Sequence, residues 1–149
     1  WDKGSDNMPG ALEGYEAPLY SDVIKWMQEG WIDYVTPQCY WGFDNYSEKE
    51  DGTRVDVVKY ADIVKWWSER ASETNTKLYI GMALYRAKDE GIWSNDEMIA
   101  DELKFNQNFD NVLGFTMFTY TSFTSNRNNC FEKMRKNYLK TITKAANPL

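Results

Sequence analysis

The chain has 149 residues, a formal net charge of −6 and no histidine. The length suffices for one domain with a hydrophobic core, and no apolar run is long enough for a membrane span or a signal segment. The acidic balance argues against a nucleic-acid backbone or an anionic membrane as the main partner. The absence of histidine excludes a Ser-His-Asp triad, a Cys-His pair and a histidine-ligated zinc site within the chain. Seven Trp, ten Tyr and seven Phe favour a binding role for part of the aromatic content.

Helical periodicity and capping signals occur at several places along the chain. They predict four helices, at about residues 19–30, 55–71, 94–109 and 126–145. Gly30 fits the left-handed stop of the first helix, and Ser94 and Glu97 have the spacing of a capping box at the start of the third. The eight residues YSDVIKWM (20–27) recur as YADIVKWW (60–67), which indicates repeated units.

Strand-like apolar runs follow the first three helices. They cover residues 31–41, 78–85 and 111–120, and the segments 44–54 and 86–93 are predicted to be polar loops. Strands that alternate with helices favour an α/β fold with parallel strands and right-handed crossovers. Either a doubly wound sheet or a (βα)8 barrel satisfies this order.

The second strand-like run favours the barrel. Gly81 and Ala83 alternate there with larger aliphatic residues, as expected where small side chains point into a barrel and large ones face the helices. No glycine-rich turn follows any of the three strands, so we expect no dinucleotide or phosphate site and no cofactor. Two cysteines, Cys39 and Cys130, are too few for a zinc knuckle, and free thiols are the simplest expectation, with a disulfide as the alternative.

Four strings carry a family resemblance: GWIDYVTPQCYW (30–41), VKWW (64–67), KLYIGMALYR (77–86) and GFTMFTYTSF (114–123). They resemble the glycosyl-hydrolase-like family 10 proteins over about residues 19–123. The resemblance implies a (βα)8 barrel in a secreted or lipid-anchored bacterial protein that acts on cell-wall or other glycans. Residues 1–149 then look like a single partial domain, the C-terminal part of the barrel with about strands six to eight and their flanking helices. The start at Trp1 agrees with a piece of a longer protein.

Candidate sugar-binding residues stand at the ends of the predicted strands, where a (βα)8 protein has its site. They are Gln38, Tyr40, Trp41, Tyr85, Arg86 and Tyr120. An aromatic ring can stack on the C–H face of a sugar while a phenol, indole or amide bonds a hydroxyl group. Each residue has a plainer alternative, which is packing under a loop for the rings and an internal network for Gln38. Arg86 is placed either to bind a substrate carboxylate, as in muramic or uronic acids, or to pair with Asp89.

Catalytic carboxylates are missing from these strand ends. Glycoside hydrolysis needs two carboxyl groups, and the second strand ends at Leu84, Tyr85 and Arg86 with no acid before Asp89. The catalytic residues therefore stay unassigned. Two functions are open: part of a glycoside hydrolase, or a non-catalytic carbohydrate-binding or scaffolding module. A weaker third is a self-contained α/β domain that binds a protein partner. If the barrel is partial, its unpaired edges predict self-association of the 149-residue chain, for instance as a homodimer.

Overall fold

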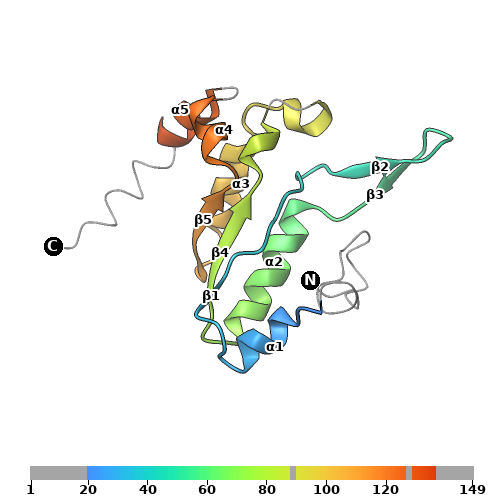
Figure 1. The fold of residues 1–149 in the computed structure, drawn as a ribbon. Helices are drawn as coiled ribbons and strands as arrows, with labels where there is room; N and C mark the ends of the chain where they lie inside the picture. Colours follow the sequence, from blue (N-terminus) through green and yellow to red (C-terminus); the bar gives the residue numbers. More distant parts are fainter. Residues whose placement is uncertain (1–19, 88–89, 127–128, 137–149) are drawn as a thin grey trace.

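The computed structural model of the protein describes residues 20–87, 90–126 and 129–136. It is an α/β fold around a three-stranded parallel sheet (Figure 1). The strands are β1 (Tyr34–Val35), β4 (Lys77–Met82) and β5 (Val112–Met117), and they lie side by side in the order β1-β4-β5. The expected parallel pairing of three strands that are separated by helices is confirmed.

The remaining elements connect or flank these strands. They are α1 (Val23–Gln28), the antiparallel pair β2 (Tyr46–Glu48) and β3 (Arg54–Asp56), α2 (Tyr60–Ser72), the 3-10 turns η1 (Leu84–Arg86) and η2 (Gly91–Ser94), α3 (Met98–Asn106), α4 (Tyr120–Thr124) and α5 (Cys130–Met134). The first helix begins where the Asp22 carboxylate accepts a hydrogen bond from the Lys25 backbone at 3.0 Å. It ends before Gly30, whose φ of 68° is the expected left-handed stop.

The two faces of the sheet differ in composition. Leu78, Ile80 and Met82 of β4 are fully buried and belong to one core with the buried residues of α2 and α3, which lie alongside the sheet in Figure 1. The alternate positions, Tyr79 and Gly81, point to the other face, because successive strand residues alternate. The expectation that the larger aliphatic residues of this strand face the helices therefore agrees with the burial.

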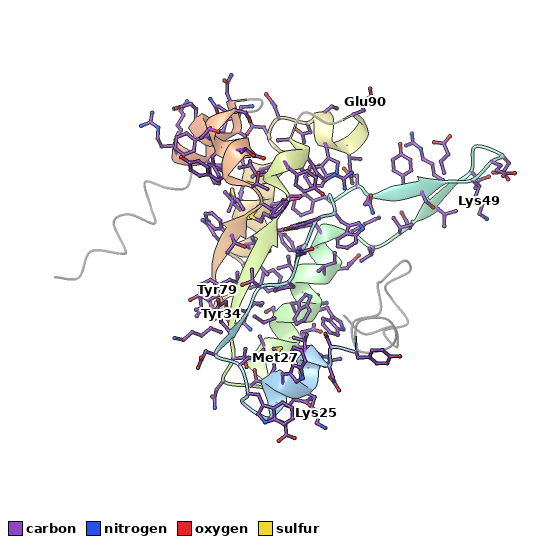
Figure 2. All side chains as sticks on the ribbon, viewed as in Figure 1. Lys25, Met27, Tyr34, Lys49, Tyr79 and Glu90 are labelled. Atoms are coloured by element: carbon purple, nitrogen blue, oxygen red, sulfur yellow. The ribbon has the colours of Figure 1, made fainter. Side chains whose placement is uncertain are left out.

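That second face carries no helix in the described residues. Tyr34, which is 62% exposed, packs edge-on against Tyr79 with ring centroids 6.0 Å apart, and Figure 2 shows the two together on the sheet. The Tyr79 ring also lies over Gly114, where an added Cβ would be 3.2 Å from it. At the outer edge, Leu113 is 54% exposed beside a hollow of about 370 Å³ between β5 and α3.

Two predicted boundaries between residues 44 and 71 are wrong. The segment 44–54, predicted as a polar loop, contains β2 and leads into β3, and the two strands form a hairpin that projects from the body, with Lys49 near its tip (Figure 2). The helix predicted from residue 55 begins only at Tyr60, because residues 54–56 pair with β2. The Asn45 amide donates to the Val58 carbonyl at 3.0 Å and closes the base of the hairpin.

The third and fourth helices also differ from expectation. Ser94 lies in η2, where its hydroxyl donates to the Gly91 carbonyl at 2.7 Å, and α3 starts at Met98 without a capping box. The Glu97 carboxylate instead pairs with Lys133 of α5 at 2.9 Å.

The single helix expected at 126–145 is replaced, as far as it is described, by α5, which follows α4, a helix of the same length of five residues. The positive φ angles of Asn126 and Asn129 break the helical conformation between α4 and α5. Residues 137–149 of that prediction lie outside the described residues.

Other expectations concern single residues and the chain as a whole. Cys39 and Cys130 are both buried free thiols, as the simplest reading held. The tryptophans of α2, Trp66 and Trp67, are buried in the hydrophobic core. Among the described residues no helix has the length and apolar character needed to span a membrane.

Candidate functional site at the carboxyl ends of the strands

The carboxyl ends of the three strands are joined by a continuous set of backbone hydrogen bonds. Beyond β1, Gln38 pairs with Gly81, and the Cys39 amide donates to the Gly81 carbonyl at 2.8 Å. Beyond β5, the Phe118 amide donates to the Met82 carbonyl at 3.1 Å, and the Tyr85 amide donates to the Phe118 carbonyl at 3.0 Å. Three segments that are distant in the sequence therefore meet along one edge of the sheet.

An aromatic cluster occupies this edge and consists of Tyr40, Tyr85 and Phe118. The ring of Tyr40 is 5.9 Å from that of Tyr85 and 6.3 Å from that of Phe118, and the last two rings are 6.0 Å apart. These separations are typical of stabilising aromatic pairs. The segment that follows each strand contributes one ring, so the cluster exists only when the parallel sheet is formed.

The cluster is partly open to solvent. Phe118 is 55% exposed and Tyr85 is 39% exposed, whereas Tyr40 is half-buried between them. The pKa of the Tyr40 phenol is raised, chiefly by burial and then by the neighbouring Tyr85 and Cys39. Exposed rings with hydroxyl groups at their margin offer both an apolar surface and hydrogen-bonding groups.

Arg86 lies behind the cluster. One of its guanidinium nitrogens, Nη1, donates to the Tyr40 carbonyl at 3.2 Å, and the guanidinium stands 4.9 Å from the ring centroid of the buried Trp93. The arginine thus connects the end of β1 with η1 and η2. The other expectation for Arg86 was an ion pair with Asp89, and Asp89 lies outside the described residues.

The other predicted site residues are distributed around this edge. Gln38 is exposed, and its amide makes no hydrogen bond within the described part of the chain. Trp41 is half-buried and packs against the hydrophobic core. Tyr120 is 79% exposed as the first residue of α4, but it makes no ring contact with the cluster among the described residues. The structure therefore brings Tyr40, Tyr85 and Arg86 together, with Gln38 two residues before Tyr40 in the segment that follows β1.

Phe118 was not among the predicted residues. Its signal was present in the sequence, because Gly114, Thr116 and Phe118 alternate along the third strand-like run and fall on the face opposite to Phe115 and Met117. Ser122, the neighbour of Tyr120 at the same strand end, is buried and bonds the backbone of Thr119 within the first turn of α4.

The functional groups at this edge do not include a carboxylate. The segments that form it, 38–41, 83–86 and 118–120, contain no Asp or Glu. Among the residues that the structure describes, no group of three or more His, Cys, Asp or Glu side chains is arranged to hold a metal ion. Rings, an amide and phenol groups remain, which are groups that contact neutral polyhydroxylated molecules well.

The fold and this edge define an α/β protein whose parallel strands present exposed aromatic rings at their carboxyl ends. Residues 10–99 match the model of the family described as glycosyl hydrolase-like 10. The chain belongs to this family. Tyr40, Tyr85 and Arg86 lie inside the matched region, whereas Phe118 and Tyr120 lie beyond it.

Curated relatives agree with the family match. The glycosyl hydrolase DigH of Escherichia coli K12 is 32% identical over 80 residues, which are 54% of this chain and 16% of DigH. The glycosyl hydrolase YngK of Bacillus subtilis is 28% identical over 127 residues, which are 84% of this chain and 23% of YngK. The chain thus spans less than a quarter of the length of these relatives.

Proposed function

We propose that the chain forms the C-terminal part of a glycoside-hydrolase-like (βα)8 barrel and supplies a sugar-binding wall at its open end. The aromatic cluster of Tyr40, Tyr85 and Phe118 at the carboxyl ends of three parallel strands carries this proposal. In a (βα)8 protein the site lies at that end of the strands, and exposed rings there can stack on sugar rings. Gln38 and Tyr120 flank the cluster and extend the wall.

The sheet supports the partial barrel. Its order β1-β4-β5 is that of consecutive barrel strands, with helices packed on one face and Tyr34 and Tyr79 on the other. In a closed barrel that second face becomes the interior, and both sheet edges acquire partners. The outer edge of β5, with its adjoining hollow and the exposed Leu113, is where a further strand would pair. The relatives are long enough to contain the remaining strands, because the matched region is only 16% of DigH and 23% of YngK.

A binding experiment tests the sugar-binding wall. We expect the chain to bind short β-linked oligosaccharides weakly in isothermal titration, and Tyr85→Ala and Phe118→Ala each to lower the affinity about tenfold, as loss of one stacking ring implies. Leu113→Ala, at an equally exposed apolar residue away from the cluster, is the control and is expected to leave the affinity unchanged. Equal affinities for all four proteins, or no binding by any of them, would contradict the proposal.

The reaction of the whole protein is proposed to be acid/base hydrolysis of a glycosidic bond by two carboxyl groups. Its support is the family, because the strand ends described above carry no acid. The 149-residue chain is therefore expected to bind glycans without hydrolysing them, and robust turnover by this chain would contradict that expectation. The missing acids equally favour the alternative, a non-catalytic carbohydrate-binding or scaffolding module. Acids at the other strand ends of the barrel would decide for the hydrolase.

The place of action is proposed from the family resemblance alone. We expect a secreted or lipid-anchored bacterial protein that works outside the cytoplasm, where cell-wall glycans are found. Fractionation of the source cell, followed by detection of the protein with an antibody, tests this. Recovery in the cytoplasmic fraction alone would contradict it.

Self-association is the expected behaviour of the 149-residue chain in isolation. Among the described residues β5 is an edge strand with Leu113 exposed on it, and the backbone groups of such edges pair with other chains. We expect light scattering to show a mass that rises with concentration, toward a homodimer in which two partial barrels meet at their edges. Leu113→Lys should shift the equilibrium toward the monomer, because a charge on an edge strand opposes pairing. A monomeric mass at every concentration would show that the edges do not associate.

A further inference from the structure

We propose that Arg86 is a positioning residue that holds the Tyr40 ring in the aromatic cluster. The starting observation is the geometry of its guanidinium group, which donates from Nη1 to the Tyr40 carbonyl at 3.2 Å and stacks 4.9 Å from the centroid of Trp93. A planar guanidinium can make both interactions at once, the hydrogen bond in its plane and the stacking with its face. The two anchors together hold the backbone of Tyr40 at its carbonyl group and thereby restrict where its ring lies.

Tyr40 needs such an anchor because regular strand pairing ends before it. The last ladder contacts of this segment are the Gln38–Gly81 bridge and the hydrogen bond from the Cys39 amide to Gly81. The Tyr40 carbonyl receives its bond from a side chain that is 46 residues away in the sequence. A hydrogen bond from a charged donor is stronger than a neutral one, so it is a suitable replacement for the missing backbone pairing.

Trp93 gives the anchor its rigidity. The indole is only 2% exposed and belongs to the hydrophobic core, so its position is fixed by packing. Arg86 itself is half-buried, and its backbone amide donates to the Ala83 carbonyl at 3.0 Å within η1. The guanidinium thus links the Tyr40 backbone to a core residue of fixed position. The ring of Tyr40 in turn contacts Tyr85 and Phe118.

Chemical nitration of tyrosines followed by peptide mass spectrometry tests this placement without any sugar. In the wild-type chain, Tyr40 is shielded between two rings, whereas Tyr120 is 79% exposed and serves as the internal reference. We expect Arg86→Ala to raise the nitration rate of Tyr40 relative to Tyr120 about tenfold, the factor that corresponds to one hydrogen bond from a charged donor. An unchanged ratio would overturn the proposal.

Two comparisons separate positioning from general loosening of the fold. Tyr60 is fully buried, and its nitration should stay negligible in Arg86→Ala if the core remains closed; a rise at Tyr60 equal to that at Tyr40 would contradict a local role. Arg70→Ala removes a guanidinium that is 5.4 Å from the Trp66 ring in α2, and it should leave the Tyr40 ratio unchanged. If Arg86→Ala does not fold, Arg86→Lys decides. Lysine can still donate to the carbonyl but lacks the planar stack, so a smaller rise is expected and no rise would count against the proposal.

The effect on sugar binding rests on the proposed function. If Arg86 acts by positioning Tyr40, Arg86→Ala should lower the affinity for a neutral oligosaccharide, such as chitotetraose, and the affinity for a uronic-acid oligosaccharide by the same factor. Positioning also predicts that the double variant Arg86→Ala/Tyr40→Ala binds no more weakly than Tyr40→Ala. A loss confined to the acidic sugar would show instead that Arg86 binds a substrate carboxylate, and additive losses would show that it acts independently of Tyr40. If the wild-type chain binds neither sugar, the proposed function fails, while the nitration result still decides the role of Arg86.

Discussion

The stability of the protein is expected to fall as the pH rises above about 4.5, because of Glu102 in α3. This residue is fully buried, and neither of its carboxylate oxygens has a hydrogen-bond partner in the described residues. Burial raises the pKa of the Glu102 carboxyl well above its ordinary value of 4.5. A carboxyl group in this setting is held in its neutral form, because an unpaired charge in the core is very costly.

The direction of the pH effect follows from proton binding. Between the ordinary and the raised pKa of Glu102, the folded chain holds a proton that the unfolded chain has lost. The stabilisation is therefore fully present below about pH 4.5 and is lost as the pH rises, by about 1.4 kcal/mol for each pH unit in that range. The neighbouring groups Cys39, Tyr60 and Cys130 also have raised pKa values, and for Cys130 the value is about 11, so their ionisation belongs to more alkaline pH.

Urea unfolding at several pH values measures this effect. We expect Glu102→Gln to remove the slope, so that the difference in unfolding free energy between the variant and the wild type grows as the pH rises above about 4.5. Asp101→Asn, at the exposed neighbouring position of α3, is the matched control and should follow the wild type. A difference between Glu102→Gln and the wild type that does not change with pH would show that the Glu102 carboxyl is not held neutral by the fold.

Gly81→Ala is expected to destabilise the protein strongly and to disrupt the site. A Cβ at Gly81 would lie 2.8 Å from the Pro37 carbonyl oxygen, and that oxygen accepts the hydrogen bond from the Gly81 amide. Backbone atoms of a neighbouring strand cannot move aside without breaking the pairing. We therefore expect a loss of about 2–4 kcal/mol in the free energy of unfolding, from overpacking together with a broken hydrogen bond.

Gly42→Ala provides a closely matched comparison. Its Cβ would approach an atom at 2.7 Å, but that atom is Cδ1 of Ile92, the flexible end of a side chain. We expect a cost of about 1 kcal/mol or less, because the isoleucine can change its rotamer. Urea unfolding of both variants gives the two costs. Equal costs would show that the close contact at Gly81 can relax as easily as the one at Gly42.

The sequence pattern predicted the sheet because local signals and the fold agreed there. Apolar runs between helices predicted three parallel strands, and the alternation of Ile80 and Met82 with Gly81 predicted which face meets the helices. The hairpin was missed because its residues do not alternate between apolar and polar. It projects away from the core, so no burial imposes that pattern, and Asp51 and Gly52 were the remaining turn signal. The capping box was wrong because Glu97 pairs with Lys133, which no local spacing reveals.

Some residues of the site could be predicted from the sequence, but their contacts could not. Tyr40, Tyr85 and Arg86 could be found because they end apolar runs, and the ends of parallel strands meet at one edge. Their mutual contacts could not be found, since the ring of Tyr40 meets residues 45 and 78 positions further along the chain, as the sequence numbers show. Trp93 ends the segment 86–93, which was predicted to be a polar loop, yet it is buried beneath Arg86 and supports it.

The sequence by itself determined the family, the α/β class and the parallel order of strands, because these depend on motifs and on the periodic placement of apolar residues along the chain. Only the tertiary structure decided that Tyr40, Tyr85 and Phe118 form one cluster and that Arg86 reaches the Tyr40 carbonyl. It also decided that Glu102 is buried with no hydrogen-bond partner in the part of the chain that the structure describes. These features depend on distances between residues that are remote in the sequence. Such distances are set by the packing of helices on the sheet and by strand register, which no short stretch of sequence contains.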